Sequence, residues 1–353
     1  MNQANQFFIS YYQSKEFNVY RIFLPSFYIF NTFAISSIMK QNLYLGGQNM
    51  LSINQLIKYL RNHHHITVKS NQAQSLRNIG YYHGYKGYHF IRTPNQRIPF
   101  SSLDEVIALN KFDMQLKTII YPKVMFIENA LKSYVIETVL HDCHSENLDT
   151  IFNKSITDYK SYTPGSQQYH KQYAKRMTLK GKISNALLRD YSNKKQTVNH
   201  FFNVDQPIPI WAIFESLTLG EFGTFFACSN SNVKLKTSSI LHLPSNIDTD
   251  GKITEYIIYA IKDLRNAIAH NNTIFDARFQ TSTINNRLVF LLETEVGITG
   301  LDFKYIYAYI VLITYVLRKM GETKTSCKHF ITEFIDCTDS LRKQISQTFA
   351  IKF

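Results

Sequence analysis

The stretch that decides the fold is residues 102–141, SLDEVIALNKFDMQLKTIIYPKVMFIENALKSYVIETVLH. Its apolar side chains return every three or four residues, from Phe112 through Val124 to Val139. That spacing places them on one face of a helix. The pattern therefore predicts one long helix with a buried face.

The ends and the interior of this helix carry their own signals. Ser101 or Ser102 is suited to cap its first turn, and Asp104 and Glu105 favour the positive end of the helix dipole. Pro122 lacks a backbone N–H and is expected to kink or divide the helix.

Glu128 falls on the apolar face, four residues after Val124 and three before Leu131. A buried carboxylate needs a partner, because an isolated charge is costly away from water. A structural ion pair and a functional role are both open for this side chain.

Further apolar segments extend the helical pattern to the C-terminal half. The first is expected to start after Pro209 and to be interrupted near Gly220. Val289–Thr294 is a candidate short strand, but no strand–helix alternation, G-x-G-x-x-G or P-loop occurs. The chain is therefore predicted to be mainly all-α. The segments are residues 208–227, 253–270, 303–320 and 331–349.

Composition shifts suggest how the chain is organised. We expect a small N-terminal helical subdomain that ends in a Tyr- and Gly-rich turn, GYYHGYKGYHF, before the helical core begins. The predicted parts are a helical extension (1–49), a small basic helical subdomain (50–98), a helical core (99–320) with a basic helical insertion at about 154–200, and a C-terminal helix (321–353).

The charge of the chain is concentrated in two blocks. Lys and Arg number 39 among 353 residues against 26 Asp and Glu, a formal charge of +13. Residues 50–100 hold 7 basic and no acidic side chains, and residues 154–200 hold 10 and 2. An ordinary surface mixes its signs, so this segregation favours an extended contact with a polyanionic partner such as nucleic acid or a membrane surface.

Both blocks interleave cations with aromatic residues such as Tyr169, Tyr173 and Tyr191. This mixture suits phosphate contacts together with base stacking, although a solvated basic helix face is the simpler alternative. The candidate RNA-binding residues are Lys58, Arg61, Lys69, Arg77, Lys86, Lys171, Lys175, Arg176, Lys180, Lys182, Arg189, Lys194 and Lys195.

Metal and cofactor chemistry is not indicated. Residues 63–65 are three consecutive histidines, whose side chains point in different directions, and His141 and His144 lie at the predicted end of a helix. The four cysteines are scattered without a C-x-x-C pair, which fits a reducing cytoplasm. We therefore expect no metal and no cofactor.

A membrane location is not indicated either. The N-terminus lacks the pattern of a signal peptide. The apolar stretches 17–39 and 305–317 are interrupted or too short to span a bilayer, and we interpret them as buried core helices. The expected location is cytoplasmic.

The chemistry-bearing pattern is R-N-A-I-A-H, residues 265–270. A histidine can accept or donate a proton near neutral pH, and an arginine can bind phosphate. Asn266 and His270 share a helix face, whereas Arg265 and His270 are about 140° apart. They converge only if the helix end bends or if two copies meet.

Four segments resemble the Abi family of bacterial abortive-infection proteins, of the AbiD/AbiF type. They occur in the order of the family's blocks, over roughly residues 50–320. The segments are QLIKYLRNHHHITVKSNQAQSLRNIGYYHGYKGYHF, FDMQLKTIIYPKVMFIENALKSYV, PIPIWAIFESLTLGEFG and LRNAIAHN.

The resemblance implies a HEPN-like helical bundle in which R-N-x-x-x-H is a ribonuclease signature. Arg265, Asn266 and His270 match that motif as catalytic residues, and Glu128 matches an acidic position of the first long helix. Lys132 stands where an arginine is often found, so a planar bidentate contact is replaced by a point charge. The further supporting candidates are Glu128, Lys132 and Asn271.

Together, these observations predict a metal-independent endoribonuclease of phage defence or of a toxin–antitoxin system. A single motif per chain implies a homodimer with a composite site. The two basic blocks suggest that a structured RNA, a guide or an antitoxin, also binds. The alternative is a non-catalytic RNA-binding or scaffold protein in which Arg265 and His270 hold the dimer together.

Overall fold

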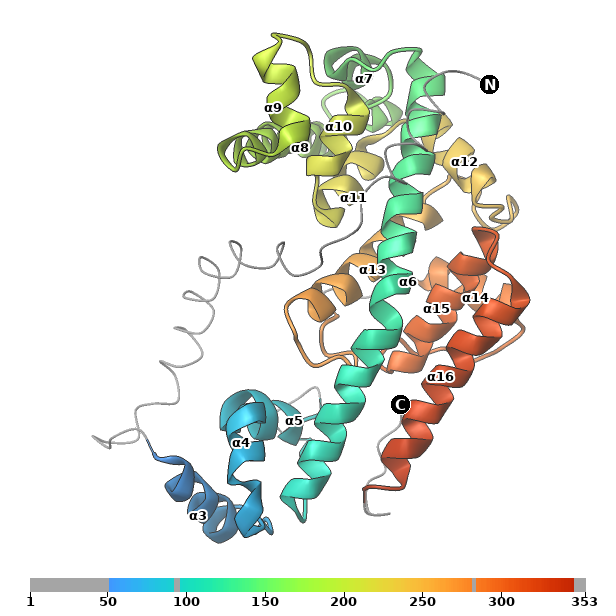
Figure 1. Cartoon of the computed structure of the whole chain (residues 1–353). Helices are drawn as coiled ribbons and strands as arrows, with labels where there is room; N and C mark the ends of the chain where they lie inside the picture. The colour runs from blue at the N-terminus through green and yellow to red at the C-terminus, as the bar shows by residue number, and fades with distance from the viewer. Residues whose placement is uncertain (1–50, 92–95, 281–283, 346–353) are drawn as a thin grey trace. The chain divides into compact units, whose positions relative to one another are not determined.

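The computed structural model describes residues 51–91, 96–280 and 284–345 (Figure 1). The chain divides into two units, Met1–Gln55 and Leu56–Phe353. Within the described residues, helices alternate with turns, and two isolated β-bridges take the place of any sheet. The predicted all-α class is confirmed, whereas the extension 1–49 and the apolar stretch 17–39 lie outside the described residues.

The elements follow one another with short connections. In chain order they are α3 (Ile53–His63), η2 (Ser70–Gln72), α4 (Ala73–Ile79), η3 (Gly80–Lys86), α5 (Gly87–His89), α6 (Leu103–Cys143), α7 (Leu148–Lys154), η4 (Asp158–Ser161), α8 (Gln167–Ser192), α9 (Gln196–Asn203), α10 (Ile210–Ser216), α11 (Leu219–Cys228), α12 (Ser231–Ile240), α13 (Ile253–Ala269), α14 (Asn286–Val296), α15 (Ile306–Lys319) and α16 (Lys324–Arg342).

Helix α6 is the element on which the second unit is built. The predicted helix 102–141 is confirmed, with Ser102 as its N-cap: the Ser102 hydroxyl accepts from the Glu105 N–H, and the Glu105 carboxylate accepts from the Ser102 N–H. The helix continues through Pro122 without being divided. Figure 1 shows α12, α13, α15 and α16 beside it, and each of them packs against it.

The apolar face of α6 forms the centre of the core. Leu116, Ile120, Val124, Ile127 and Leu131 are completely buried, as the helical periodicity predicts. Each such side chain stabilises the fold by about 1.5–3 kcal/mol relative to exposure. The face therefore holds the surrounding helices, including α13, in place.

One local prediction was wrong. Val289–Thr294, the candidate strand, lies inside helix α14, where Leu288, Leu291 and Leu292 are buried at helical spacing. The interruption predicted near Gly220 is present: α10 ends at Ser216, and α11 starts after its Thr218 cap.

The Tyr- and Gly-rich segment is more ordered than the predicted turn. Residues Gly80–Lys86 form a π-helix, η3, followed directly by α5. Gly80 has φ +73°, a conformation that suits glycine, and a Cβ at Gly84 would lie 2.7 Å from the Ile79 carbonyl oxygen. Such single-turn π-helices often occur at functional sites.

Candidate functional site

The R-N-x-x-x-H motif lies at the C-terminal end of α13. The helix ends at Ala269, and His270 is its C-cap with an exposed side chain. Asn271 follows with φ +53°, and two backbone bonds close the end: the Asn271 N–H donates to the Ile268 carbonyl and the Asn272 N–H to the Ala267 carbonyl. This is a Schellman motif with asparagine in the left-handed position. The chain therefore bends directly after His270.

Arg265 joins a buried charge cluster on α6. Its Nε lies 3.3 Å from Oε2 of Glu128, without the alignment of a hydrogen bond, and Lys132 Nζ lies 3.1 Å from Oε1. Lys132 also donates to the Leu217 carbonyl at 3.0 Å. The structural ion pair proposed for Glu128 is present, and its partner is the arginine of the motif. Asn266 accepts a long hydrogen bond, 3.4 Å, from Arg265.

Removing the charge of Glu128 should destabilise the fold. Breaking a buried pair costs about 3–5 kcal/mol. The Arg265 and Lys132 side chains are 28% and 14% exposed, so water screens part of the loss and we expect about 2 kcal/mol for Glu128→Gln. Urea unfolding measures this difference.

The matched control is Glu137→Gln, on the exposed side of the same helix. It should stay within about 0.5 kcal/mol of the wild type. Equal losses in the two variants would show that the Glu128 cluster contributes nothing to stability.

A second buried pair on α6 holds the segment that follows the motif. Asp113 is fully buried, and its Oδ2 forms an ion pair with Lys117 Nζ at 2.7 Å. Its Oδ1 accepts hydrogen bonds from the N–H groups of Ile274 (2.8 Å) and Phe275 (3.0 Å). Lys117 Nζ also donates to Asn271 Oδ1 at 2.8 Å. We call Asp113 and Lys117 the clamp, because together they hold Asn271 at the bend and residues 274–275 just after it.

The segment of residues 80–90 reaches the same place from another part of the sequence. Tyr88 donates from its hydroxyl to Asp113 Oδ2 at 3.1 Å, and Nε2 of His83 lies 3.4 Å from Nδ2 of Asn271. Arg278 donates to the carbonyls of Gly87 and Phe90, which ties the two segments together. Burial raises the pKa of Tyr88 far above its usual range, with Asp113 adding to the effect, so the phenol stays protonated.

Sequence reasoning identified Arg265, Asn266, His270, Glu128, Lys132 and Asn271 but missed the clamp and His83. Asp113 and Lys117 repeat the acid-then-lysine spacing of Glu128 and Lys132 on the same helix, a signal that was present. Within the described residues no hydrogen bond or ion pair joins Arg265 to His270. The chain thus brings Asn271 and His83 together, but not the two ends of the motif.

Most of the predicted RNA-binding cations are engaged inside the chain. Arg176, for example, donates to the carbonyls of Phe152 and Ile156, and Lys69 pairs with Asp104 at 2.8 Å. Those with an ion pair or a side-chain hydrogen bond are Arg61, Lys69, Arg77, Lys175, Arg176, Lys180, Arg189 and Lys195.

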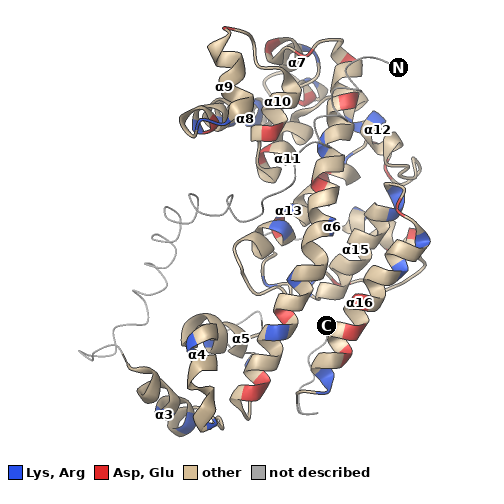
Figure 2. Cartoon of the chain, in the orientation of Figure 1, with Lys and Arg blue, Asp and Glu red and all other residues tan. Residues whose placement is uncertain are grey.

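The remaining cations are more available. Lys86 lies over the rings of Tyr81 and Tyr82, at 5.7 and 5.6 Å from their centroids. The other four make no ion pair or side-chain hydrogen bond within residues 51–91, 96–280 and 284–345. Figure 2 shows Lys and Arg positions on α8, α3 and α4. These four are Lys58, Lys171, Lys182 and Lys194.

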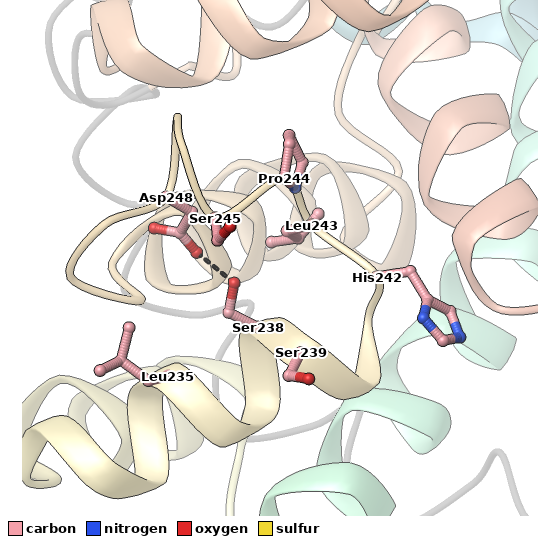
Figure 3. A pocket seen from close by; sticks show the side chains of 8 residues that line it. All are labelled: Leu235, Ser238, Ser239, His242, Leu243, Pro244, Ser245 and Asp248. Carbon is pink, nitrogen blue, oxygen red and sulfur yellow. Dashed lines mark hydrogen bonds between the residues drawn. The ribbon is translucent and has the colours of Figure 1, made fainter.

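A pocket at the end of α12 contains Ser238, His242 and Asp248, the residue types of a hydrolytic triad (Figure 3). Figure 3 shows His242 directed away from the other two. Ser238 donates to Asp248 Oδ2 at 2.6 Å, while Asp248 Oδ1 accepts from the Ile253 N–H at the start of α13. The pocket residue Asp248 therefore anchors the motif helix, and the three side chains form no triad.

Other reactive groups of the described residues do not form a second site. They include no group of His, Cys, Asp and Glu side chains that could hold a metal ion. All four cysteines are free thiols, and burial raises the pKa of Cys228 to about 11, so that thiol is protonated at neutral pH. Among the described helices, none has both the length and the apolar character needed to span a bilayer.

The fold and the site define an all-helical protein with a polar motif clamped at the end of a core helix. The sequence model of the family described as Abi-like protein matches residues 74–276, more than half of the chain, so the protein belongs to this family. The matched region contains η3, α6 and α13, the three elements of the site. No curated protein and no solved structure matches the chain. Membership suggests abortive infection as the biological context.

Proposed function

We propose that this protein is a HEPN-type, metal-independent endoribonuclease that acts in abortive infection or as a toxin. The observation that supports this most directly is the end of α13. There, His270 is exposed at a fixed bend and Arg265 is held by Glu128. An imidazole that can transfer a proton and a guanidinium that can bind phosphate are two of the groups that cleavage of a phosphodiester uses.

In the proposed reaction, the RNA 2′-hydroxyl attacks the adjacent phosphorus. His270 accepts the proton from the hydroxyl, Arg265 stabilises the negative charge that develops on the phosphoryl oxygens, and Asn266 orients the imidazole. The products are a 2′,3′-cyclic phosphate and a 5′-hydroxyl. Because the nucleophile is the 2′-hydroxyl, RNA is the substrate and DNA is not.

A homodimer would bring two motifs together. Met114 and Tyr121 lie three residues before and four after Lys117, on the flank of α6 that carries the clamp. Their side chains are 44% and 36% exposed. Apolar side chains in solvent beside the motif are suited to burial against a second copy.

The second part of the proposal is a bound structured RNA, acting as guide or antitoxin in the cytoplasm. Support comes from the unengaged lysines, of which Lys171 and Lys182 lie on α8. Tyr173 and Tyr191 are 37% and 49% exposed on the same helix, which gives surfaces for base stacking. The cations that bind other groups of the chain, such as Arg176, stabilise the fold in this proposal and do not contact RNA.

The function is tested with oligoribonucleotides, purified protein and excess chelator. We expect cleavage to products that end in a 2′,3′-cyclic phosphate, and no cleavage where a 2′-deoxynucleotide replaces the nucleotide at the cut. RNA from expressing cells should show 5′-hydroxyl ends at the same sequences. Binding without cleavage, both in the tube and in cells, would instead favour the non-catalytic scaffold.

A further inference from the structure

His83 is placed beside the motif by contacts that do not involve its own imidazole. Tyr81 and Tyr85 of the same π-helix are buried, and Tyr88 just beyond it bonds to the fully buried Asp113. Arg278, in the chain after the motif, donates to the carbonyls of Gly87 and Phe90. The backbone that carries His83 is therefore fixed against the segment that follows His270.

The imidazole itself is free for another role. His83 is exposed, and its nearest polar partner is Asn271, the residue after His270, at 3.4 Å. Asn271 is in turn held by Lys117 at 2.8 Å. Because the His83 imidazole is exposed and its contact with Asn271 is long, it adds little to the stability of the fold. Its position places a second histidine beside His270 at the end of α13.

Cleavage of RNA by its 2′-hydroxyl needs two proton transfers. One removes the proton from the attacking oxygen, and the other delivers a proton to the 5′-oxygen that leaves. The attacking and leaving oxygens lie on opposite sides of the phosphorus. One imidazole does not reach both of these oxygens at once. If His270 carries out one proton transfer, another group must carry out the second.

We propose that His83 is the general acid of this site, an inference that rests on the proposed ribonuclease function. The neutral imidazole of His270 takes the 2′-hydroxyl proton as the O2′–P bond forms. The imidazolium of His83 gives its proton to O5′ as the P–O5′ bond breaks. The enzyme is left with His270 protonated and His83 neutral, and exchange with water restores both.

The test compares two RNA substrates that differ in the leaving atom. One has the natural 5′-oxygen at the cut, and the other has sulfur at that bridging position, a leaving group that needs no protonation. His83→Ala should cleave the oxygen substrate about 100-fold or more slowly than the wild type and the sulfur substrate at nearly the wild-type rate. His270→Ala should be slow on both.

The matched control is His63→Ala, an exposed histidine on α3. It should behave as wild type on both substrates. Wild-type rates for His83→Ala on the oxygen substrate would overturn the proposal and point to the second copy's own histidine as the acid. A His83→Ala defect that sulfur does not rescue would also overturn it, because that result marks a positioning role. If the wild type cleaves neither substrate, the ribonuclease function itself fails.

Discussion

His270→Ala is expected to slow RNA cleavage by about 10²–10⁴-fold, the usual contribution of a positioned acid or base. The fold should be unchanged, because His270 is exposed and its helix-capping contact uses only the backbone N–H, which donates to the Asn266 carbonyl at 3.0 Å. Alanine keeps that N–H. The free energy of unfolding should therefore stay within about 0.5 kcal/mol of the wild type.

Rates on an oligoribonucleotide and urea unfolding of the same preparations check both parts. The control is His141→Ala, an exposed histidine near the end of α6, which should keep wild-type cleavage. A folded His270→Ala protein that still cleaves at the wild-type rate would remove His270 from the site. Loss of toxicity in cells should parallel loss of cleavage.

The long helices could be predicted from sequence because their signals are local and repeated. The apolar face of α6 returns through more than ten turns, and its Ser102 cap is adjacent in sequence. Val289–Thr294 shows the opposite case, since a run of six residues does not distinguish a strand from a turn and a half of helix. Leu288 directly before the run and Leu291 and Leu292 within it are buried at helical spacing, and that burial selects the helix.

The motif could also be predicted, but its supports could not. Lys117 meets Asn271 across 154 residues, and His83 meets Asn271 across 188. No local pattern records such contacts. The same limit applies to the basic blocks, since composition does not reveal that Arg176 binds backbone carbonyls while Lys182 on the same helix does not.

The clamp gives the second large prediction: Asp113→Ala should lower the free energy of unfolding by about 3–5 kcal/mol. The change leaves Lys117, whose side chain is 7% exposed, as a buried cation without its partner. It also leaves the N–H groups of Ile274 and Phe275 without the acceptor that holds them. Urea unfolding measures the loss.

The matched control is Asp339→Ala, which breaks an exposed pair with Arg342 on α16. Such a pair contributes about 0.3–0.5 kcal/mol, so a similar loss for Asp113→Ala would show that the clamp does not stabilise the fold. Hydrogen exchange separates a local from a global effect: the amides of Ile274 and Phe275 should lose protection more than those in the middle of α6. Because these residues directly follow the motif, their release should also slow cleavage under conditions where the variant is still folded.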